Sequence, residues 1–414
     1  PPALSSSGVV AAGPGPDGGL RVDDLTDGST LLERPDVCGH VAAVDDAATR
    51  AVVENASCEE QPIGVQLVDL TSGATMSEWD PDVWSAAFGP QDTIAEDLLV
   101  IHLDFVRQEL VPRARKDYRQ PAPIYAHSLR TFGIDVAPRE LAWQARASFR
   151  EIQLQMQEIA AEVARLRNLP SADYRDVIRA LKTEQLVGED ILRHYRQRLR
   201  QIEEIVRREG LVTLPARAAR IRLASEAESA AIPAPHMSMP RLIGNSGELG
   251  EFVLPLRIPG GQGTSKQFDD FTFAAASWTL TVHEARPGHE MQFASMIEGG
   301  VSVARAIFAA NSTNVEGWAL YAESFVKPYM PPAGQLISLQ HRLVRAARAF
   351  LDPELQLGLI TPEEARRVLL EDVVLSDAAT TSEVDRYTFR IPGQACSYYY
   401  GYSRTIALRS EVQK

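Results

Sequence analysis

Cysteine and long apolar runs are scarce in this chain of 414 residues. Three cysteines (Cys38, Cys58 and Cys396) are too few for a disulfide scaffold and have no metal-ligand spacing. We therefore expect free thiols, although Cys38 and Cys58 would be the pair to form in an oxidising compartment. No run approaches the roughly 18 apolar residues of a membrane span, which predicts no membrane partner. The chain has 42 basic and 55 acidic residues, which gives a net charge of −13. This negative charge disfavours nucleic acid as a partner.

A signal peptide is also absent from the start of the sequence. Residues 1–16 lack a basic beginning and a long apolar stretch. This absence favours a cytoplasmic location. Because the chain does not begin with Met, a trimmed terminus would leave a secreted or periplasmic location open. The composition, 45% hydrophobic and 23% charged, is that of a globular protein with a sizeable core.

Changes in composition and periodicity along the chain predict five segments. Pro, Gly and Ser dominate the first residues, which indicates a flexible arm. The following segment has short and mixed secondary-structure signals, which predict no particular fold. The predicted segments are a flexible arm (1–25), an uncertain N-terminal segment (26–90), a helical half with a long helical hairpin (91–210), a small β-element (211–265) and a metal-binding helical half (266–414).

Helical periodicity is clear after about residue 90. An N-cap at Asp92 or Thr93 and the apolar run Ile94–Leu110 predict one helix, which Pro112 ends. Apolar residues recur every three or four positions over 152–166 and again over 191–206, which predicts two long helices. The stop and cap at Leu169-Pro170-Ser171 suggest that these two helices form an antiparallel hairpin.

The period changes between residues 211 and 265. Ala219–Ala224 alternates and Glu251–Leu256 is extended, so both are expected as strands of a small β-element. Helical signals resume at about 269, and Thr361 begins a further helix with a capping box. The predicted fold class is mainly α, with a small β-element and a cleft between two helical halves. We expect Glu251–Leu256 to line this cleft as an edge strand for an extended substrate.

The stretch TVHEARPGHEMQ at 281–292 carries the strongest chemical signal. His283 and His289 are six residues apart, and Glu284 follows the first histidine. On a regular helix the two imidazoles would point about 120° apart, which argues against a shared metal. Pro287 and Gly288, however, predict a local distortion that would return His289 to the face of His283. The alternative is a helix that ends at this step, with two capping or core histidines.

A carboxylate 27 residues beyond His289 favours the metal interpretation. Glu316 lies on an otherwise apolar helical stretch, where an unpaired charge is costly to bury. Two histidines and one glutamate, with a fourth position left for water, form a known catalytic zinc arrangement. Glu323, two turns further on, is interpreted as a surface charge. His341 lies on a C-terminal helix from which it could reach the cleft.

A third cluster, at 383–402, contains several polar residues that suit a substrate. A tyrosine can donate a hydrogen bond to the oxyanion of peptide hydrolysis, and arginine can hold a carboxylate with two hydrogen bonds. Taken alone, the run favours an aromatic core with solvent-exposed arginines over a substrate site. The candidates are Tyr387 and Tyr398 as catalytic residues and Arg386, Arg390 and Gln394 as substrate-binding residues.

Together these segments resemble the bacterial domain-of-unknown-function family numbered 885. The resemblance covers roughly 265–405. It departs after Arg348, where related sequences often carry Asp-x-Gly-x-His and this chain has Asp352 and Gln356 without the glycine. The matching residues are His283-Glu284-x-x-Pro287-Gly288-His289-x-x-Gln292, Glu316-Gly317-Trp318-Ala319-Leu320-Tyr321-x-Glu323, Arg386-Tyr387, Pro392-Gly393-Gln394-Ala395 and Ser397-Tyr398.

The resemblance implies a mostly helical, gluzincin-like zinc metallopeptidase. It implies metal ligands at His283, His289 and Glu316 and a general base at Glu284, with Zn²⁺ or another divalent metal as the cofactor. The expected substrate is a peptide or a small amide. Two other functions stay open: a metal-dependent biosynthetic tailoring enzyme acting on a small or amino-acid-derived substrate, and a non-catalytic binding scaffold.

Overall fold

The computed structural model divides the chain into two compact units, Pro1–Lys116 and Asp117–Lys414. The boundary falls within the segment predicted as the first helical half. The structure describes residues 3–4, 10–14, 19–24, 29–38, 40–44, 50–54, 65–70, 72, 74–79, 106–113 and 117–414, the last range without 187–189, 226–227, 230–231, 233, 256–257, 260–264, 267–268 and 309–310.

The first unit contains two four-stranded antiparallel sheets, β1-β2-β3-β4 and β5-β6-β7-β8. Strands from both sheets share one apolar cluster, which includes Leu20, Val22, Val41, Val53 and Val68. The strands are Ala3–Leu4 (β1), Val10–Pro14 (β2), Gly19–Asp24 (β3), Thr30–Cys38 (β4), His40–Val44 (β5), Arg50–Glu54 (β6), Val65–Asp69 (β7) and Thr75–Trp79 (β8).

The described residues of the range 1–25 form strands, so the prediction of a flexible arm is wrong for them. Strands β1, β2 and β3 lie there and pair in register. Antiparallel pairing satisfies the backbone groups of a stretch whose composition alone indicates a loop. The helix expected over Ile94–Leu110 lies mostly outside the described residues, and only its end is seen, as a π-helical turn at Val106–Leu110 (η2) followed by a 3₁₀ turn at Val111–Arg113 (η3).

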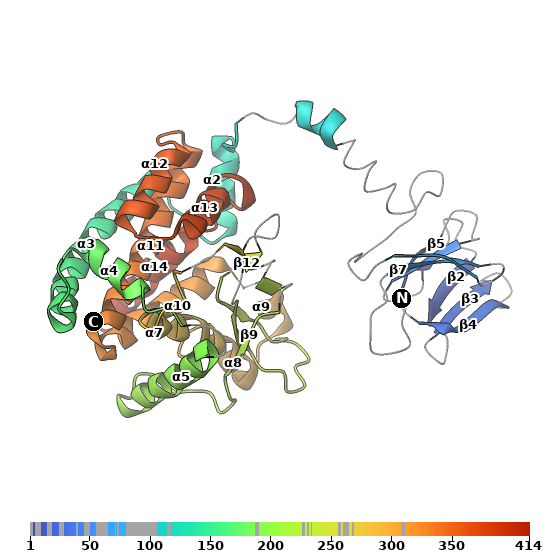
Figure 1. Cartoon of the computed structure of the whole chain (residues 1–414), viewed down its shortest axis with the longest axis horizontal. Coiled ribbons are helices and arrows are strands. Elements are labelled where there is room, and N and C mark those ends of the chain that lie inside the picture. Colours follow the sequence, from blue (N-terminus) through green and yellow to red (C-terminus); the bar gives the residue numbers. More distant parts are fainter. Residues whose placement is uncertain are drawn as a thin grey trace. The chain divides into compact units, whose positions relative to one another are not determined.

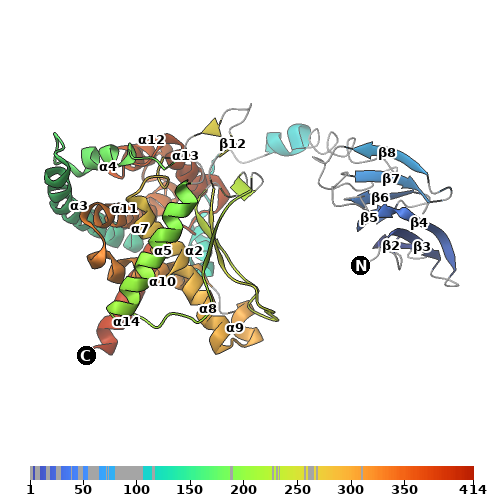
Figure 2. The same ribbon diagram turned by 60° about the horizontal axis from the view of Figure 1, so that its bottom comes forward.

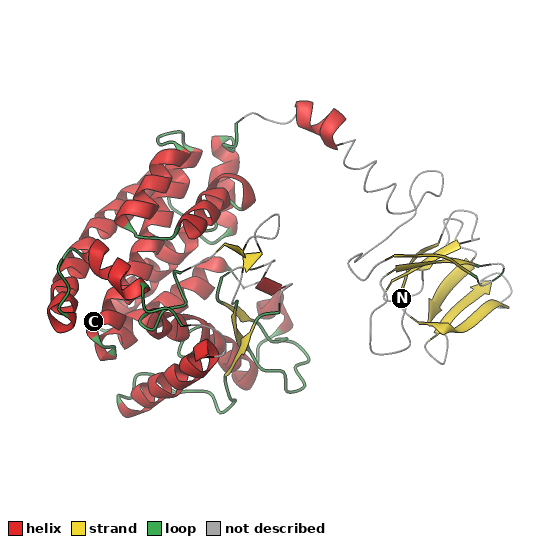
Figure 3. Ribbon diagram, viewed as in Figure 1, coloured by secondary structure: helices red, strands yellow, loops and turns green. Residues whose placement is uncertain are grey.

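The second unit is mostly helical, with small sheets on one side (Figure 1, Figure 3). None of its described helices is long and apolar enough to cross a membrane. Its α-helices are Ala122–Thr131 (α2), Pro138–Arg167 (α3), Tyr174–Lys182 (α4), Asp190–Arg208 (α5), Ala276–Leu280 (α7), His289–Gly299 (α8), Val303–Phe308 (α9), Ser312–Val326 (α10), Pro332–Gln356 (α11), Pro362–Arg367 (α12), Asp377–Asp385 (α13) and Cys396–Val412 (α14). Shorter helical turns are Thr281–Ala285 (η5, π), Lys327–Tyr329 (η6, 3₁₀), Val368–Asp372 (η7, π) and Arg386–Arg390 (η8, π).

Helix α11 forms the centre of this unit, packed between α3 and α14 (Figure 1). Small residues such as Ala346 and Ala349 face its neighbours, and Phe350 stacks edge-on with Phe149 of α3 at 5.3 Å between ring centroids. The two long helices predicted at 152–166 and 191–206 are confirmed as α3 and α5. The hairpin between them is wrong, because α4 intervenes and α3 packs along α11 instead.

The β-element at 211–265 is confirmed as a three-stranded sheet with a separate two-stranded ribbon. The sheet has the order β10-β11-β9, and β11 pairs antiparallel with β10 and parallel with β9. Because β11 is central and its residues Phe252–Leu254 are buried, it cannot act as the predicted edge strand for a substrate. The strands are Arg220–Leu223 (β9), His236–Ser238 (β10), Glu251–Leu254 (β11), Ile258–Pro259 (β12) and Ser265–Lys266 (β13).

Helix ends agree with local sequence signals. Thr361 accepts a hydrogen bond from the Glu364 backbone while the Glu364 carboxylate accepts one from the Thr361 backbone, so the predicted capping box is confirmed. Proline occupies the first turn of α3, α11 and α12, where its missing N–H has no intrahelical partner to lose.

Candidate metal centre

The segment 276–289 contains the helical distortion that the sequence predicts. Helix α7 passes into the π-helical turn η5, which carries His283. The chain then leaves helical geometry at Arg286, whose peptide bond to Pro287 is cis, and α8 starts at His289. The two histidines therefore belong to two separate helical segments. Their ring centroids lie 4.7 Å apart.

Gly288 makes this return of the chain sterically possible. A Cβ atom at this position would overlap the carbonyl oxygens of Val282 and His283. The position therefore requires glycine for space, although its φ of −80° is accessible to other residues. Trp318 closes the turn from α10, because its indole Nε1 donates to the carbonyl oxygen of Pro287 at 3.0 Å.

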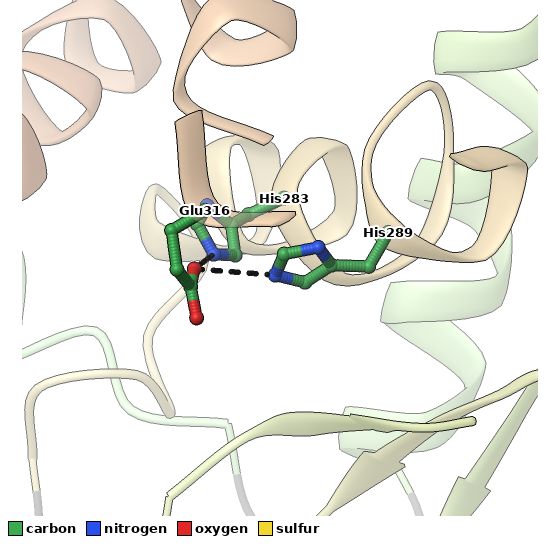
Figure 4. Close-up of side chains that lie close together, drawn as sticks. All are labelled: His283, His289 and Glu316. Atoms are coloured by element: carbon green, nitrogen blue, oxygen red, sulfur yellow. Dashed lines mark ion pairs between the residues drawn. The ribbon is translucent and has the colours of Figure 1, made fainter. Parts of the chain in front are cut away.

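His283, His289 and Glu316 converge on one point (Figure 4). Oε2 of Glu316 lies 3.3 Å from Nε2 of His283 and 3.4 Å from Nε2 of His289. The side chains of the two histidines are nearly fully buried, and that of Glu316 is 14% exposed. The shared metal-ligand set that the sequence predicts is thus brought together by the fold.

These distances fit a tetrahedral cation. Ligand atoms about 2.0–2.1 Å from a zinc ion lie roughly 3.3–3.4 Å from one another at tetrahedral angles. The separations from Glu316 Oε2 to the two imidazole nitrogens are 3.3 and 3.4 Å. The same buried oxygen makes no hydrogen bond among the described residues. The donor set therefore fits a divalent metal.

Glu323 determines which nitrogen of His283 faces this point. Its Oε1 lies 2.6 Å from Nδ1 of His283, and its Oε2 accepts a hydrogen bond from Thr279 at 2.6 Å. A carboxylate only accepts, so Nδ1 carries the hydrogen and Nε2 is free to act as a ligand. The interpretation of Glu323 as a surface charge is wrong, since the residue is 2% exposed.

The electrostatics of this cluster favour added positive charge. Burial by itself would lower the pKa of His283, but three surrounding carboxylates (Glu284, Glu316 and Glu323) raise it to about 9. Burial would raise the pKa of Glu316, yet the two histidines hold it well below its ordinary value. The pKa of Glu284 is raised, chiefly by burial. Two imidazoles among three buried glutamates thus form an environment that stabilises a cation.

The position of Glu316 depends on a close contact between two helices. Gly317, the next residue of α10, faces Gly401 of α14, and a Cβ on either glycine would overlap the backbone of the opposite helix. Asn311 caps the start of α10 through the backbone N–H of Asn314. Helix α10 is therefore anchored at its first turn and immediately after the glutamate.

A cavity of about 410 Å³ opens beside the metal-ligand set. All of its lining residues lie at 234–235 and 270–398, so the cavity belongs to one helical region and its β-element. This cavity is therefore not a cleft between the two predicted helical halves. The residues that line it are Ala234, Pro235, Asp270, Phe271, Leu280, His283, Glu284, Gln340, His341, Val344, Arg345, Arg348, Leu375, Ala379, Ser382, Glu383, Arg386, Arg390, Ile391 and Tyr398.

Four of the predicted catalytic and substrate-binding residues line this cavity: Glu284, Tyr398, Arg386 and Arg390. The ring of Tyr398 is stacked with that of His283 at 6.4 Å, and its hydroxyl lies 3.4 Å from Nη2 of Arg386.

Two other predicted residues do not reach the cavity wall. Tyr387 is fully buried and donates to Glu383 at 2.6 Å. Gln394 accepts from Arg386 and donates to Ser312 at 2.9 Å, which gives it a supporting position behind Arg386. The hydroxyl of Tyr387 is therefore held in a structural contact.

Four charged residues of the cavity wall were not predicted from the sequence: Asp270, Arg345, Arg348 and Glu383. Arg348 makes two hydrogen bonds to the carboxylate of Glu383, at 2.7 and 2.8 Å. Arg345 is 8% exposed, and its Nη2 lies 3.9 Å from Glu323. The helical periodicity of α11 was the available signal, because it places His341, Arg345 and Arg348 on one face.

Fold and site together define a mostly helical protein with a buried His/His/Glu set beside a cavity. The chain belongs to the family described as "Bacterial protein of unknown function (DUF885)", whose model matches residues 49–414. No curated protein matches the chain.

Two solved structures share its fold. One is a "putative lipoprotein" from Colwellia psychrerythraea, with 21% identity and a TM-score of 0.63 over 75% of this chain and 53% of that chain. The other is a "putative lipoprotein of unknown function" from Shewanella oneidensis, with 20% identity and a TM-score of 0.62 over 77% of this chain and 57% of that chain. The chain thus spans little more than half the length of these two proteins.

Proposed function

We propose that this protein is a metal-dependent hydrolase of peptide or amide bonds, with a gluzincin-like centre of His283, His289 and Glu316. The observation that carries the proposal is the position of Glu316 Oε2, 3.3 and 3.4 Å from the two imidazole nitrogens, beside a cavity that Glu284 also lines. A divalent ion such as zinc, when bound, supplies a Lewis acid that polarises a carbonyl and lowers the pKa of water. Manganese and cobalt would accept the same ligands.

Glu284 is the general base of this proposal. Its Oε1 lies 3.9 Å from Nε2 of His283, so its carboxylate is next to the centre without replacing a ligand. From this position it can accept the proton of the attacking water and deliver it to the leaving amine. No other carboxylate both lines the described cavity and lies next to a histidine of the ligand set.

Tyr398 and the arginines form the substrate side. Tyr398 lines the cavity with its ring stacked on that of His283, and its hydroxyl is suited to donate to the oxyanion. Arg390 lines the cavity, is exposed and makes no ion pair among the described residues, whereas Arg386 is held by Gln394 and Glu383. These two arginines would hold a carboxylate of the substrate.

The size of the cavity favours small substrates. A volume of about 410 Å³ lies at the lower end of the ~300–1,000 Å³ range of small-molecule sites. A short peptide with a free carboxylate fits this size and charge. An amino-acid-derived amide fits equally, so a biosynthetic tailoring enzyme with the same metal centre is the second candidate function.

An extracytoplasmic location is part of this proposal. The two structural neighbours are described as lipoproteins, which are proteins of the cell envelope. This description replaces the cytoplasmic location expected from the sequence, for which the comparisons offer no support.

Two measurements test the proposed function. Elemental analysis of protein purified without added metal is expected to show one divalent ion per chain. A panel of short peptides and N-acyl amino acids then identifies the bond that is hydrolysed, with Glu284→Gln as the inactive control. Absence of metal binding would leave the non-catalytic scaffold as the better interpretation.

A further inference from the structure

A second cavity, of about 650 Å³, lies between α5 and the segment 215–222. Helix α5 runs beside the small sheet in Figure 2, and β9 is the strand next to it. The second cavity shares no lining residue with the cavity at the metal-ligand set. It is therefore a separate site. Its lining residues are Arg196, Leu199, Arg200, Glu203, Arg207, Pro215, Ala216, Arg217, Ala218, Ala219, Arg220, Ile221, Arg222, Glu251 and Arg286.

Arginine dominates this lining, with seven arginines against two glutamates. Three of the arginines are neutralised by ion pairs. Glu203 lies 3.0 Å from Arg286 and 3.1 Å from Arg207. Arg222 lies 2.7 Å from each of Glu228 and Glu251.

The guanidinium groups of the other four arginines make no ion pair with a carboxylate of the described residues. Arg196 donates to the backbone oxygen of Ile221 at 3.2 Å, and Arg217 donates to a side-chain amide and a backbone oxygen. The side chains of Arg200 and Arg220 make no hydrogen bond or ion pair within the described part of the chain. We refer to Arg196, Arg200, Arg217 and Arg220 with the cavity between them as the arginine groove.

The arginine groove continues along α5. A neighbouring cavity of about 380 Å³ is lined by Leu192, Arg193, Arg196, Arg200 and Leu223, and it shares Arg196 and Arg200 with the groove. The concave surface is thus elongated and follows the helix.

Such a concentration of positive charge is unexpected in a chain with a net charge of −13. Like charges held side by side destabilise the folded state unless counter-charges offset them. Three arginines of the same cavity have such counter-charges in ion pairs, and Arg217 interacts electrostatically with Glu248 and Glu290. Arg196, Arg200 and Arg220 have no ion pair among the described residues. An anionic ligand from outside the chain would supply their counter-charges.

We propose that the arginine groove binds an acidic peptide segment in an extended conformation. Arg196 and Arg200 are four residues apart on α5, a rise of about 6 Å. Alternate side chains of an extended peptide repeat at about 6.6–6.8 Å, so two glutamates at positions i and i+2 match this spacing. The opposite wall is the stretch 215–222, whose strand β9 is an edge strand of its sheet. An edge strand beside a cationic helix is suited to an extended acidic chain.

The experiment measures fluorescence anisotropy of a labelled peptide, (Glu-Ala)₄, with the full chain and without added metal. Wild type is expected to bind with an affinity that falls as salt rises. The double variant Arg200→Glu, Arg220→Glu is expected to bind about tenfold more weakly or worse. The matched control is Arg208→Glu, also on α5, because Arg208 lies outside both arginine-lined cavities and pairs with Glu209. Its affinity for the peptide should equal that of wild type.

Three results would overturn the proposal: no binding by wild type, equal binding by the double variant, or inorganic tripolyphosphate that binds more tightly than the peptide and displaces it. The last result would assign the groove to a phosphate ligand. If the double reversal fails to fold, Arg200→Gln with Arg220→Gln removes the same charges. None of these readouts needs hydrolysis, so the outcome is independent of the proposed function.

Discussion

His283 and Glu323 are joined by a 2.6 Å contact between Nδ1 and a carboxylate oxygen, on the side of the imidazole away from Glu316. This contact fixes the tautomer and the rotation of the ring. It comes from α10, the same helix that supplies Glu316. One helix therefore provides both a candidate ligand and the residue that orients its neighbouring ligand.

Replacing Glu323 with Gln tests this orienting role. The amide can still accept a hydrogen bond but loses the charge, so zinc affinity is expected to fall about 10–100-fold. The change is measured by competition with a chelating dye. Exposed Glu371→Gln serves as the control and should leave the affinity unchanged. Equal affinities of Glu323→Gln and wild type would mean that the contact is only structural.

Removing a ligand should abolish stabilisation by metal. Zinc at 100 times its dissociation constant is expected to stabilise wild type by about 2.7 kcal/mol. The variants His289→Ala and Glu316→Ala should show almost none of this gain in thermal unfolding with and without zinc. Exposed His127→Ala should respond like wild type. If zinc stabilises either ligand variant as much as it stabilises wild type, the assignment of His289 and Glu316 as metal ligands is wrong.

Glu284→Gln separates catalysis from metal binding. Loss of the general base should lower kcat by about 10²–10⁴-fold, because the amide cannot accept the proton. The bound metal per chain should stay close to that of wild type. If the variant loses its metal, Glu284 is a ligand or a structural residue instead of the base.

Gly288→Ala tests the steric argument for the turn. The new Cβ would overlap two backbone oxygens of η5, so the free energy of unfolding should fall by about 3 kcal/mol, the upper end for overpacking. Metal binding should weaken with it. Gly299→Ala, in the last turn of α8 with no atom near its Cβ position, is the matched control and should cost little. Similar denaturation midpoints for both variants would refute the close approach.

Asp352 predicts a pH dependence of stability. Burial raises its pKa from 3.8 to about 7, although the hydroxyl of Tyr125 and the backbone of Gly393 donate to it. Between these two values the native state binds the proton more than the unfolded chain does. The contribution of Asp352 to the free energy of unfolding is therefore largest below pH 4. It is lost as the pH rises towards 7.

The variant Asp352→Asn removes this titration. Its stability relative to wild type should rise with pH between 4 and 7, by at most about 1.4 kcal/mol per pH unit. Urea unfolding at several pH values measures the difference. Exposed Glu158→Gln on α3 is the control and should follow wild type at every pH. A difference between Asp352→Asn and wild type that does not vary with pH would show that the carboxyl has no raised pKa.

Local patterns in the sequence predicted the approach of His283 and His289, because that approach depends on a local event. Pro287 cannot continue a helix and Gly288 permits the close return of the chain, so the approach of His289 to His283 follows from neighbouring residues. The prediction of a small β-element also held, since alternation at Ala219–Ala224 is a property of the strand itself. The packing of α3 against α11 could not be predicted. An apolar stripe shows that one face of a helix is buried, but it does not identify the element that packs against that face.

The sequence by itself determined the long helices, the capping box at Thr361 and the break between His283 and His289, all of which depend on residues close together in the chain. Only the tertiary structure decided that Glu323 is buried behind His283, that Arg345 and Arg348 line the cavity, and that β11 is central in its sheet. The physical reason is that a charged residue on a helix has the same local pattern whether it faces water or a cation. Its environment is determined by distant segments that pack against it.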